Sequence, residues 1–302
     1  MVRPVRFRMN EETTVNNFFQ EDLDLQNELI NQKAQEEFDT LVGKLREVGV
    51  KVLAVDDLYE QNTPDSIFPN NWISFHQNGD VAIYPMFAEN RRRERREDIL
   101  DLVEAAGFVI ENVYDYTAAE KENLFLEGTG AMVLDRVHRK AYCALSPRAD
   151  EELLIEFCED FEYTPVIFKA YQQVNGVAEP IYHTNVMMAV AESFAVVCLE
   201  AIEDKSERKN VLHHLKEDGK EVIAITVEQM LQYAGNMLQV RGEKGNYLVM
   251  SDSAYQVLTP QQRSQIEQHC KILHSGIETI ETCGGGSARC MLAEIFLPKE
   301  VN

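Results

Sequence analysis

The strongest constraint on the fold of this chain is an internal repeat. A hairpin, a helix and a further strand follow one another along the sequence, and each hairpin begins near a polar residue. These residues are Asn71, Glu127, His183, Asn236 and Cys290, separated by 56, 56, 53 and 54 positions. Five units at a nearly constant step in 302 residues indicate a ring that closes. The five strand starts then converge around one central axis.

Hydrophobic periodicity and turn signals place the elements within each unit. We expect hairpins over residues 73–84, 125–145, 186–199 and 237–250, helices over 34–49, 92–106, 150–159, 206–217 and 260–269, and single strands over 51–55, 109–113, 166–168, 222–225 and 272–273. An N-terminal strand over residues 5–9 is expected to complete the unit that a C-terminal strand over 291–296 begins. The sequence thus predicts one domain spanning residues 1–302.

Composition narrows the class of protein. The chain is 45% apolar and 26% charged, as is ordinary for a globular protein, and its net charge of −22 argues against binding nucleic acid or an anionic membrane surface. The N-terminus lacks the apolar segment of a signal peptide, and no apolar run is long enough to span a bilayer. The six scattered cysteines fit reduced thiols of a cytoplasmic protein, and no zinc-ligand spacing occurs.

The repeat brings together a thiol, an imidazole and a carboxylate. A neighbouring imidazole converts a cysteine to its nucleophilic thiolate, and a carboxylate fixes the orientation of the imidazole. We therefore expect Cys290 to be the nucleophile, His183 the general acid and base, and Glu127 the orienting partner. A lone histidine or buried cysteine is more often structural; the shared repeat position is what favours catalysis.

Two other residues are weaker candidates for a role in the site. Cys283 is an alternative nucleophile, because it shares the glycine-rich loop with Cys290. Asn236 either lines the substrate pocket or only makes a structural hydrogen bond at the start of a strand. The run 91–96 is typical of a solvated helix face, although an arginine from it could bind a substrate carboxylate. Arg289, beside the nucleophile, is the rival for that role.

Three motifs resemble those of the pentein superfamily, which includes arginine deiminases, dimethylarginine hydrolases and amidinotransferases. The segment 284–291 (GGGSARCM) resembles the nucleophile loop, 125–130 (FLEGTG) the Glu-Gly-Gly motif, and 183–185 (HTN) the His-x-Asp motif. The resemblance covers nearly the whole chain. It implies an α/β fold, a five-bladed propeller of ββαβ modules closed by the terminal strands, and covalent attack by cysteine on a guanidino or ureido carbon. It implies no metal and no organic cofactor.

A closer resemblance is to citrulline-utilisation hydrolases, through residues 68–73 (FPNNWI) and N-terminal motifs between residues 3 and 20. Arginine deiminases carry aspartate where this chain has Asn71 and Asn185. Two carboxylates suit a cationic guanidinium, whereas carboxamides offer donors and acceptors to a neutral ureido group. The expected reaction is hydrolysis of citrulline to ornithine, CO2 and ammonia, with Asn71, Asn185, Asn236 and Arg289 as candidate substrate-binding residues.

Other functions stay open. The nearest alternative is an arginine deiminase or dihydrolase, followed by an amidinotransferase, which transfers to an amine in place of water. A pentein-fold binding protein without catalysis is a third, against which the intact Cys290, His183 and Glu127 argue. The expected partner is a small molecule, and homo-oligomerisation is left open.

Overall fold

The structure is a computed structural model that describes residues 1–23 and 25–300. Within that part of the chain, one three-stranded sheet recurs four times. The sheets consist of β3 (Ile73–Phe75), β4 (Asp80–Ile83) and β5 (Asn112–Asp115); β6 (Met132–Asp135), β7 (Lys140–Ala144) and β8 (Thr164–Phe168); β11 (Met188–Val190), β12 (Phe194–Val197) and β13 (Glu221–Ala224); and β14 (Leu238–Gly242), β15 (Gly245–Ser251) and β16 (Lys271–Ser275). In each sheet the first two strands are antiparallel and the last two are parallel.

Helices supply the crossovers that parallel strands require. They are α2 (Glu97–Ala105), α4 (Glu151–Asp160), α5 (Lys205–Glu217), and α7 (Asp252–Val257) followed by α8 (Pro260–Glu267). The side chains of Asp150 and Asp204 cap α4 and α5, and Thr259 and Gln262 form a capping box at α8. The sequence therefore specifies where these helices begin.

The terminal unit differs from the other four. A 21-residue helix, α1 (Asn27–Glu47), precedes β2 (Val55–Asp56), which pairs in parallel with β1 (Val2–Arg3). The expected strand over 5–9 is wrong, because pairing ends at Pro4, which has no N–H to donate. The expected strand over 291–296 is also wrong. Residues 292–298 form no strand, although Val109 N–H donates to the Pro298 carbonyl at 2.9 Å, and Leu297 lies in the same core cluster as Val2.

Several element boundaries also differ from expectation. The helix over 92–106 is divided into a 3-10 helix (Glu89–Glu94) and α2, because Arg95 and Arg96 are extended. The strand expected from residue 125 begins only at Met132, after the short helix α3 (Gly128–Ala131). Residues 282–284 end helix α9 (Glu278–Gly284), which Gly285 terminates with a φ of 61°.

Further elements were not anticipated. A hairpin of β9 (Tyr171–Val174) and β10 (Val177–Pro180) turns at Asn175-Gly176, and α6 (Val227–Met230) is a single turn. The remaining 3-10 helices are Tyr59–Gln61, Pro69–Asn71, Thr117–Glu122, Thr184–Val186 and Leu199–Ala201. Among the described helices, none is long and apolar enough to cross a membrane.

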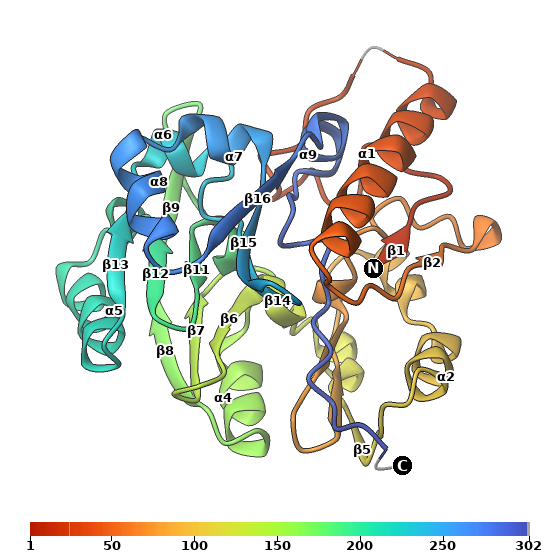
Figure 1. The fold of residues 1–302 in the computed structure, drawn as a ribbon, viewed down its shortest axis with the longest axis horizontal. Helices are drawn as coiled ribbons and strands as arrows, with labels where there is room; N and C mark the ends of the chain where they lie inside the picture. The colour runs from red at the N-terminus through yellow and green to blue at the C-terminus, as the bar shows by residue number, and fades with distance from the viewer. Residues whose placement is uncertain (24, 301–302) are drawn as a thin grey trace.

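Neighbouring sheets meet through their first strands. β6 contacts β11, β11 contacts β14, and α3, just before β6, contacts β3. Helices from neighbouring modules also pack on the sheets: β8 contacts both α4 and α5, and β16 contacts both α8 and α1. α1 packs Phe38, Leu41 and Leu45 into a cluster with Val249 of β15 and Leu273 of β16. Figure 1 shows α1 running alongside the C-terminal segment, which passes between the two halves of the molecule. The fold thus gathers the beginnings of the first strands in its interior.

Candidate active site

The five residues at equivalent repeat positions lie at the beginnings of these first strands. Asn71 ends a 3-10 helix before β3, Glu127 is the N-cap of α3, and His183 is the N-cap of the 3-10 helix before β11. Asn236 lies two residues before β14, and Cys290 closes a turn after α9. All five are at most 3% exposed. The turns and 3-10 helices, and not the strands themselves, carry the polar side chains.

Cys290 is held by amide groups from three modules. Its Sγ accepts from Asn236 Nδ2 at 3.2 Å and from Asn185 Nδ2 at 3.4 Å. With its amide oriented so that both atoms are paired, Asn70 donates to the Cys290 carbonyl at 2.6 Å and accepts from Gly130 N at 3.2 Å. Two N–H donors aimed at one sulfur suit an anionic thiolate, since charge-assisted hydrogen bonds are the stronger ones.

His183 and Glu127 form a buried pair. His183 Nε2 lies 2.8 Å from Glu127 Oε2. Burial lowers the pKa of His183 to about 4, because desolvation outweighs the attraction of Glu127. Burial would raise the pKa of Glu127, but Arg148 and the hydrogen bond from His183 lower it to about 2. At neutral pH the pair is a carboxylate and a neutral imidazole that donates from Nε2, which leaves Nδ1 with a free lone pair.

Two arginines that flank this pair connect it to its surroundings. Arg148 Nη1 lies 3.6 Å and Arg91 Nη1 3.9 Å from Glu127 Oε2. Arg148 was not anticipated. Arg91 belongs to the run 91–96, for which we expected a solvated helix face with one arginine as an alternative carboxylate ligand. Both side chains are nearly fully buried. The repeat could have predicted both arginines. The second strand of an antiparallel hairpin ends beside the start of the first, so the loops after β4 and β7, which carry Arg91 and Arg148, return to this site.

Arg91 fixes the orientation of the Asn71 amide. Its Nη1 donates to Asn71 Oδ1 at 2.9 Å, and its Nε and Nη2 each lie 2.9 Å from a Glu94 oxygen. Burial raises the pKa of Glu94 to about 8, although the neighbouring positive charge of Arg91 acts to lower it. Because a guanidinium has only donors, the Asn71 oxygen must face Arg91 and its nitrogen must face away.

Two buried polar atoms in this cluster have no hydrogen-bond partner among the described residues. They are Asn71 Nδ2, a donor, and Asn185 Oδ1, an acceptor. Gly130 leaves room beside the first: a Cβ there would lie 2.2 Å from Asn71 Nδ2 and 2.8 Å from His183 Nδ1. Unpaired buried polar groups are costly, which indicates that a ligand supplies the missing partners.

The N-terminal segment covers the site. Asn17 Nδ2 donates to the Gly284 and Gly285 carbonyls at 3.3 and 3.4 Å, and Gln20 Nε2 donates to the Cys283 carbonyl at 3.2 Å. Arg148 Nη2 donates to the Thr13 carbonyl at 3.0 Å. This accounts for the polar N-terminal motif. The Cys283 thiol instead packs in the core cluster beneath α1, where burial raises its pKa.

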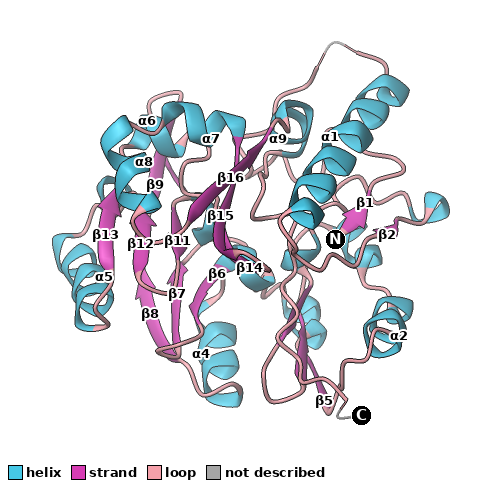
Figure 2. Ribbon diagram, in the orientation of Figure 1, coloured by secondary structure: helices cyan, strands magenta, loops and turns pink. Residues whose placement is uncertain are grey.

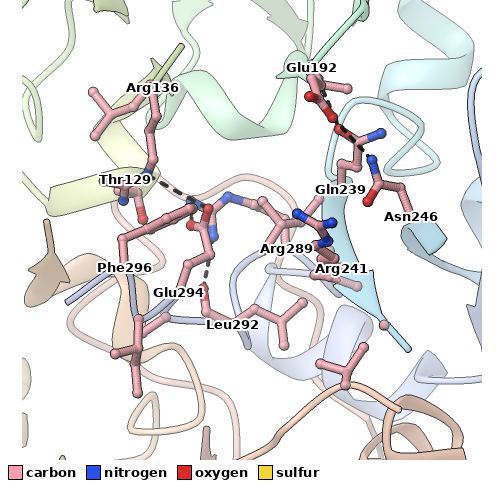
Figure 3. Close-up of a pocket in the computed structure, with 18 of the residues that line it drawn as sticks. Thr129, Arg136, Glu192, Gln239, Arg241, Asn246, Arg289, Leu292, Glu294 and Phe296 are labelled. Carbon is pink, nitrogen blue, oxygen red and sulfur yellow. Dashed lines mark hydrogen bonds and ion pairs between the residues drawn. The ribbon is translucent and has the colours of Figure 1, made fainter. Parts of the chain in front are cut away.

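Arg289 does not face the cluster around Cys290. Its Nη1 donates to the Leu292 carbonyl and its Nη2 to Glu294 Oε2, both at 2.8 Å. Its side chain lines a cavity of about 1070 Å³ whose described lining residues do not include Cys290, His183 or Glu127 (Figure 3). The backbone N–H of Arg289 donates to Asn236 Oδ1 at 3.0 Å and thus anchors the amide that contacts Cys290 Sγ.

One other cluster could hold a metal ion on geometry alone. Ligand atoms of Asp135, His138 and Asp218 lie within 4.8 Å of one another. Lysines already neutralise the carboxylates, since Lys220 Nζ lies 2.8 Å from Asp135 Oδ2 and Lys140 Nζ 2.8 Å from Asp218 Oδ2. A cation would have to displace both lysines, so these residues do not fit a metal site.

The repeated sheet and the buried thiol, imidazole and carboxylate define a member of the pentein superfamily of guanidino-modifying enzymes. The chain belongs to the family described as N,N dimethylarginine dimethylhydrolase, eukaryotic, whose model matches residues 3–297. A search of curated proteins found no match. Relatives in this superfamily are hydrolases that act on carbon–nitrogen bonds.

Solved structures share the fold. The arginine dihydrolase ArgZ, from the ornithine–ammonia cycle in cyanobacteria, is 15% identical with a TM-score of 0.75 over 99% of this chain, which spans only 40% of that protein. The N-terminal domain of ArgZ with bound product is 16% identical with a TM-score of 0.71, covering 99% of this chain and 98% of that domain. A dimethylarginine dimethylaminohydrolase adduct is 16% identical with a TM-score of 0.59, covering 86% and 90%.

Proposed function

We propose that this protein hydrolyses the ureido group of citrulline to ornithine, CO2 and ammonia through a covalent Cys290 adduct. The observation that carries the proposal is the pair of unpaired amide atoms, Asn71 Nδ2 and Asn185 Oδ1. A ureido group offers an oxygen that accepts from the first and an N–H that donates to the second. A guanidinium has only donors and would leave the Asn71 donor buried and unpaired.

Charge does not separate the two candidate substrates. Arg91 is paired with Glu94, and Arg148 lies beside Glu127, so each buried cation near the site has an anionic neighbour. The carboxylate of citrulline needs a cation, and Arg148 is our proposal for it, because Arg148 lies beside Glu127 whereas the Arg289 guanidinium faces Leu292 and Glu294.

The reaction follows from the arrangement of the three catalytic side chains. His183 Nδ1 takes the Cys290 proton, and the thiolate attacks the ureido carbon while Asn71 donates to its oxygen. His183 then protonates the departing amine, the bond from carbon to the ornithine nitrogen breaks, and a carbamoyl thioester remains on Cys290. Water deprotonated by His183 attacks that carbon, the C–S bond breaks, and the carbamate released decomposes to CO2 and ammonia. Glu127 stabilises the imidazolium formed at each step.

A second candidate is an arginine dihydrolase. It is favoured by the solved neighbours, since ArgZ is an arginine dihydrolase and its N-terminal domain has been captured covalently bound to a reaction intermediate. Both candidate functions use a covalent cysteine adduct. They differ in the substrate group that Asn71 and Asn185 would bind, a ureido group or a guanidinium.

The proposal extends to the whole protein. Four complete modules and the β1–β2 unit favour a five-bladed propeller formed by residues 1–302 as one domain. The six cysteines are unpaired and buried in the part of the chain that is described, which supports a reducing, cytoplasmic setting. Partners other than a small-molecule substrate form no part of the proposal.

The test is an ammonia-release assay on citrulline, arginine, agmatine, carbamoyl-putrescine and dimethylarginine side by side, with ornithine measured as second product. Citrulline is expected to give equimolar ornithine and ammonia with the highest kcat/KM. Ammonia from arginine, with citrulline inert, would decide for a deiminase. Cys290→Ala should give no detectable turnover and Cys283→Ala near-normal turnover; ordinary rates in Cys290→Ala would remove the proposed mechanism.

A further inference from the structure

A second space lies along the first strands. This cavity of about 1070 Å³ reaches the far ends of these strands, at Asp135 of β6, Ala191 after β11 and Gly242 of β14. The C-terminal segment 292–296 forms another wall (Figure 3). Toward the other end of the strands its lining includes Met237 and Arg289, the neighbours of Asn236 and Cys290, but the side chains of Cys290, His183 and Glu127 are not among its described lining residues, and the proposed function makes no use of it.

Charge in this cavity differs from that of the molecule as a whole. The chain has a net charge of −22, yet five cationic side chains and four anionic ones line the cavity. They are Lys51, Arg136, Arg241, Arg289 and Lys299, and Asp135, Glu192, Glu243 and Glu294. A local excess of cations on a strongly acidic protein attracts an anion by charge complementarity.

Within the described part of the chain, two of the four anionic side chains are paired with a cation, whereas three of the five cations, Lys51, Arg241 and Lys299, have no carboxylate partner. Asp135 pairs with Lys220 at 2.8 Å, and Glu294 lies 2.8 Å from Arg289 and 4.0 Å from Arg136. Within the described part of the chain, Arg241 has neither a carboxylate nor a hydrogen-bond partner, and its guanidinium projects into the cavity (Figure 3). The free charge in the cavity is therefore positive.

Among the described residues, the backbone amides of the C-terminal wall are also without acceptors. No N–H group from Ala293 to Leu297 donates to an acceptor in residues 1–23 or 25–300. The apolar part of the lining comes from side chains such as Val133, Met188 and Met237. Donors together with an apolar wall suit a ligand with an anionic end and an apolar body.

We propose that this cavity is a second ligand site, separate from the catalytic site, that takes a small organic carboxylate with an apolar body. Arg241 would receive the carboxylate in a bidentate arrangement, with amides of the C-terminal segment as further donors. Val133, Met188 and Met237 would contact the apolar body. The proposal stands independently of the substrate that Cys290 attacks.

Calorimetric titration with 1-naphthaleneacetate tests the site, with the neutral 1-naphthaleneacetamide as a matched probe. The carboxylate is expected to bind at one equivalent per chain, and the amide at least about tenfold more weakly, because losing a charged hydrogen bond costs about 1.4 kcal/mol or more. Arg241→Glu and Lys299→Glu should each weaken the carboxylate by about tenfold or more. Lys244→Glu is the control: Lys244 is exposed in the β14–β15 turn and does not line the cavity.

Three results would overturn the proposal. They are no saturable binding of the carboxylate up to millimolar concentration, equal affinities for the carboxylate and the amide, and equal effects of Arg241→Glu and Lys244→Glu. Because both variants change exposed side chains, circular dichroism should show the same fold for each, and a loss of binding can then be assigned to the cavity.

Discussion

In the proposed function, Asn71 is the side chain that distinguishes a ureido group from a guanidinium. Its oxygen is held by Arg91 at 2.9 Å, so its nitrogen is the atom presented to a ligand. The sequence alone identified Asn71 as a candidate substrate-binding residue, and it showed that a carboxamide stands where arginine deiminases have aspartate. The arginine that orients it could not be placed, because run 91–96 has the composition of a solvated helix face and only the fold shows which arginine turns inward.

Asn71→Asp replaces the free donor by a carboxylate oxygen. The kcat/KM for citrulline should fall by about tenfold to a hundredfold, because a carboxylate cannot donate to the ureido oxygen and the lost hydrogen bond is worth about 1.5–3 kcal/mol. The kcat/KM for arginine should fall less or rise. Asn27→Asp, exposed at the start of α1, is the control and should leave both constants unchanged. An unchanged ratio of the two constants in Asn71→Asp would contradict the assigned role.

His183 predicts how stability depends on pH. Its pKa is lowered from 6.5 to about 4 by burial, so the unfolded chain takes up a proton that the folded protein resists. Acidification from pH 6.5 to 4 therefore favours unfolding, by on the order of 3 kcal/mol at 1.36 kcal/mol per pKa unit. Urea denaturation at pH 6.5, 5.5 and 4.5 should show a steeper loss of stability for the native protein than for His183→Gln. Equal slopes would show that His183 is not buried as a neutral group.

At the scale of elements, the sequence predicted the hairpins and crossover helices well, because alternating apolar strands and helix caps are local signals. It failed at the terminal unit, where tertiary packing decides. The 291–296 segment has the composition of a strand, but its apolar side chains are divided between two core clusters and its backbone joins no sheet. The sequence also failed to predict that residues 282–284 belong to α9. Three consecutive glycines favour a loop, but the first of them, Gly284, is the last residue of the helix.

Helix α9 holds the nucleophile loop through one buried carboxylate. Glu281 accepts from Ser287 Oγ at 2.6 Å and from Ser253 Oγ at 2.7 Å, and the Cys290 N–H donates to the Ser287 carbonyl at 3.0 Å. Burial raises the pKa of Glu281, and no cation is within ion-pair distance of it among the described residues. Glu281 is thus a positioning residue.

Glu281→Ala should lower the unfolding free energy by about 2–3 kcal/mol, because it leaves the buried Ser287 hydroxyl and the half-buried Ser253 hydroxyl without their acceptor. The same change should reduce kcat more than KM, since it loosens the loop that places Cys290 and leaves Asn71 and Asn185 in position. Thermal unfolding and steady-state kinetics measure the two effects. Glu278→Ala, at the exposed first residue of α9, serves as the matched control. A stable Glu281→Ala protein with native kcat would refute the positioning role.

For the whole molecule, the repeat was the decisive signal. Positions about 55 residues apart predicted that Asn71, Glu127, His183, Asn236 and Cys290 converge, and the structure places all five in the buried region where the first strands begin. The spacing cannot show which loops return to that region after each second strand. Arg148 and the N-terminal cover were therefore missed, and Arg289 was assigned to a site that its guanidinium does not reach.

The most direct test of the central claim is the mass of the enzyme adduct. Acid-quenching the enzyme during citrulline turnover, followed by peptide mapping, should show a carbamoyl group on Cys290, absent in Cys290→Ala. With ureido-carbon-labelled citrulline the label should appear first in that peptide and then in CO2. An amidino group on Cys290 formed from arginine, with no carbamoyl group and no turnover from citrulline, would contradict the claim that this site is built for a neutral ureido carbon.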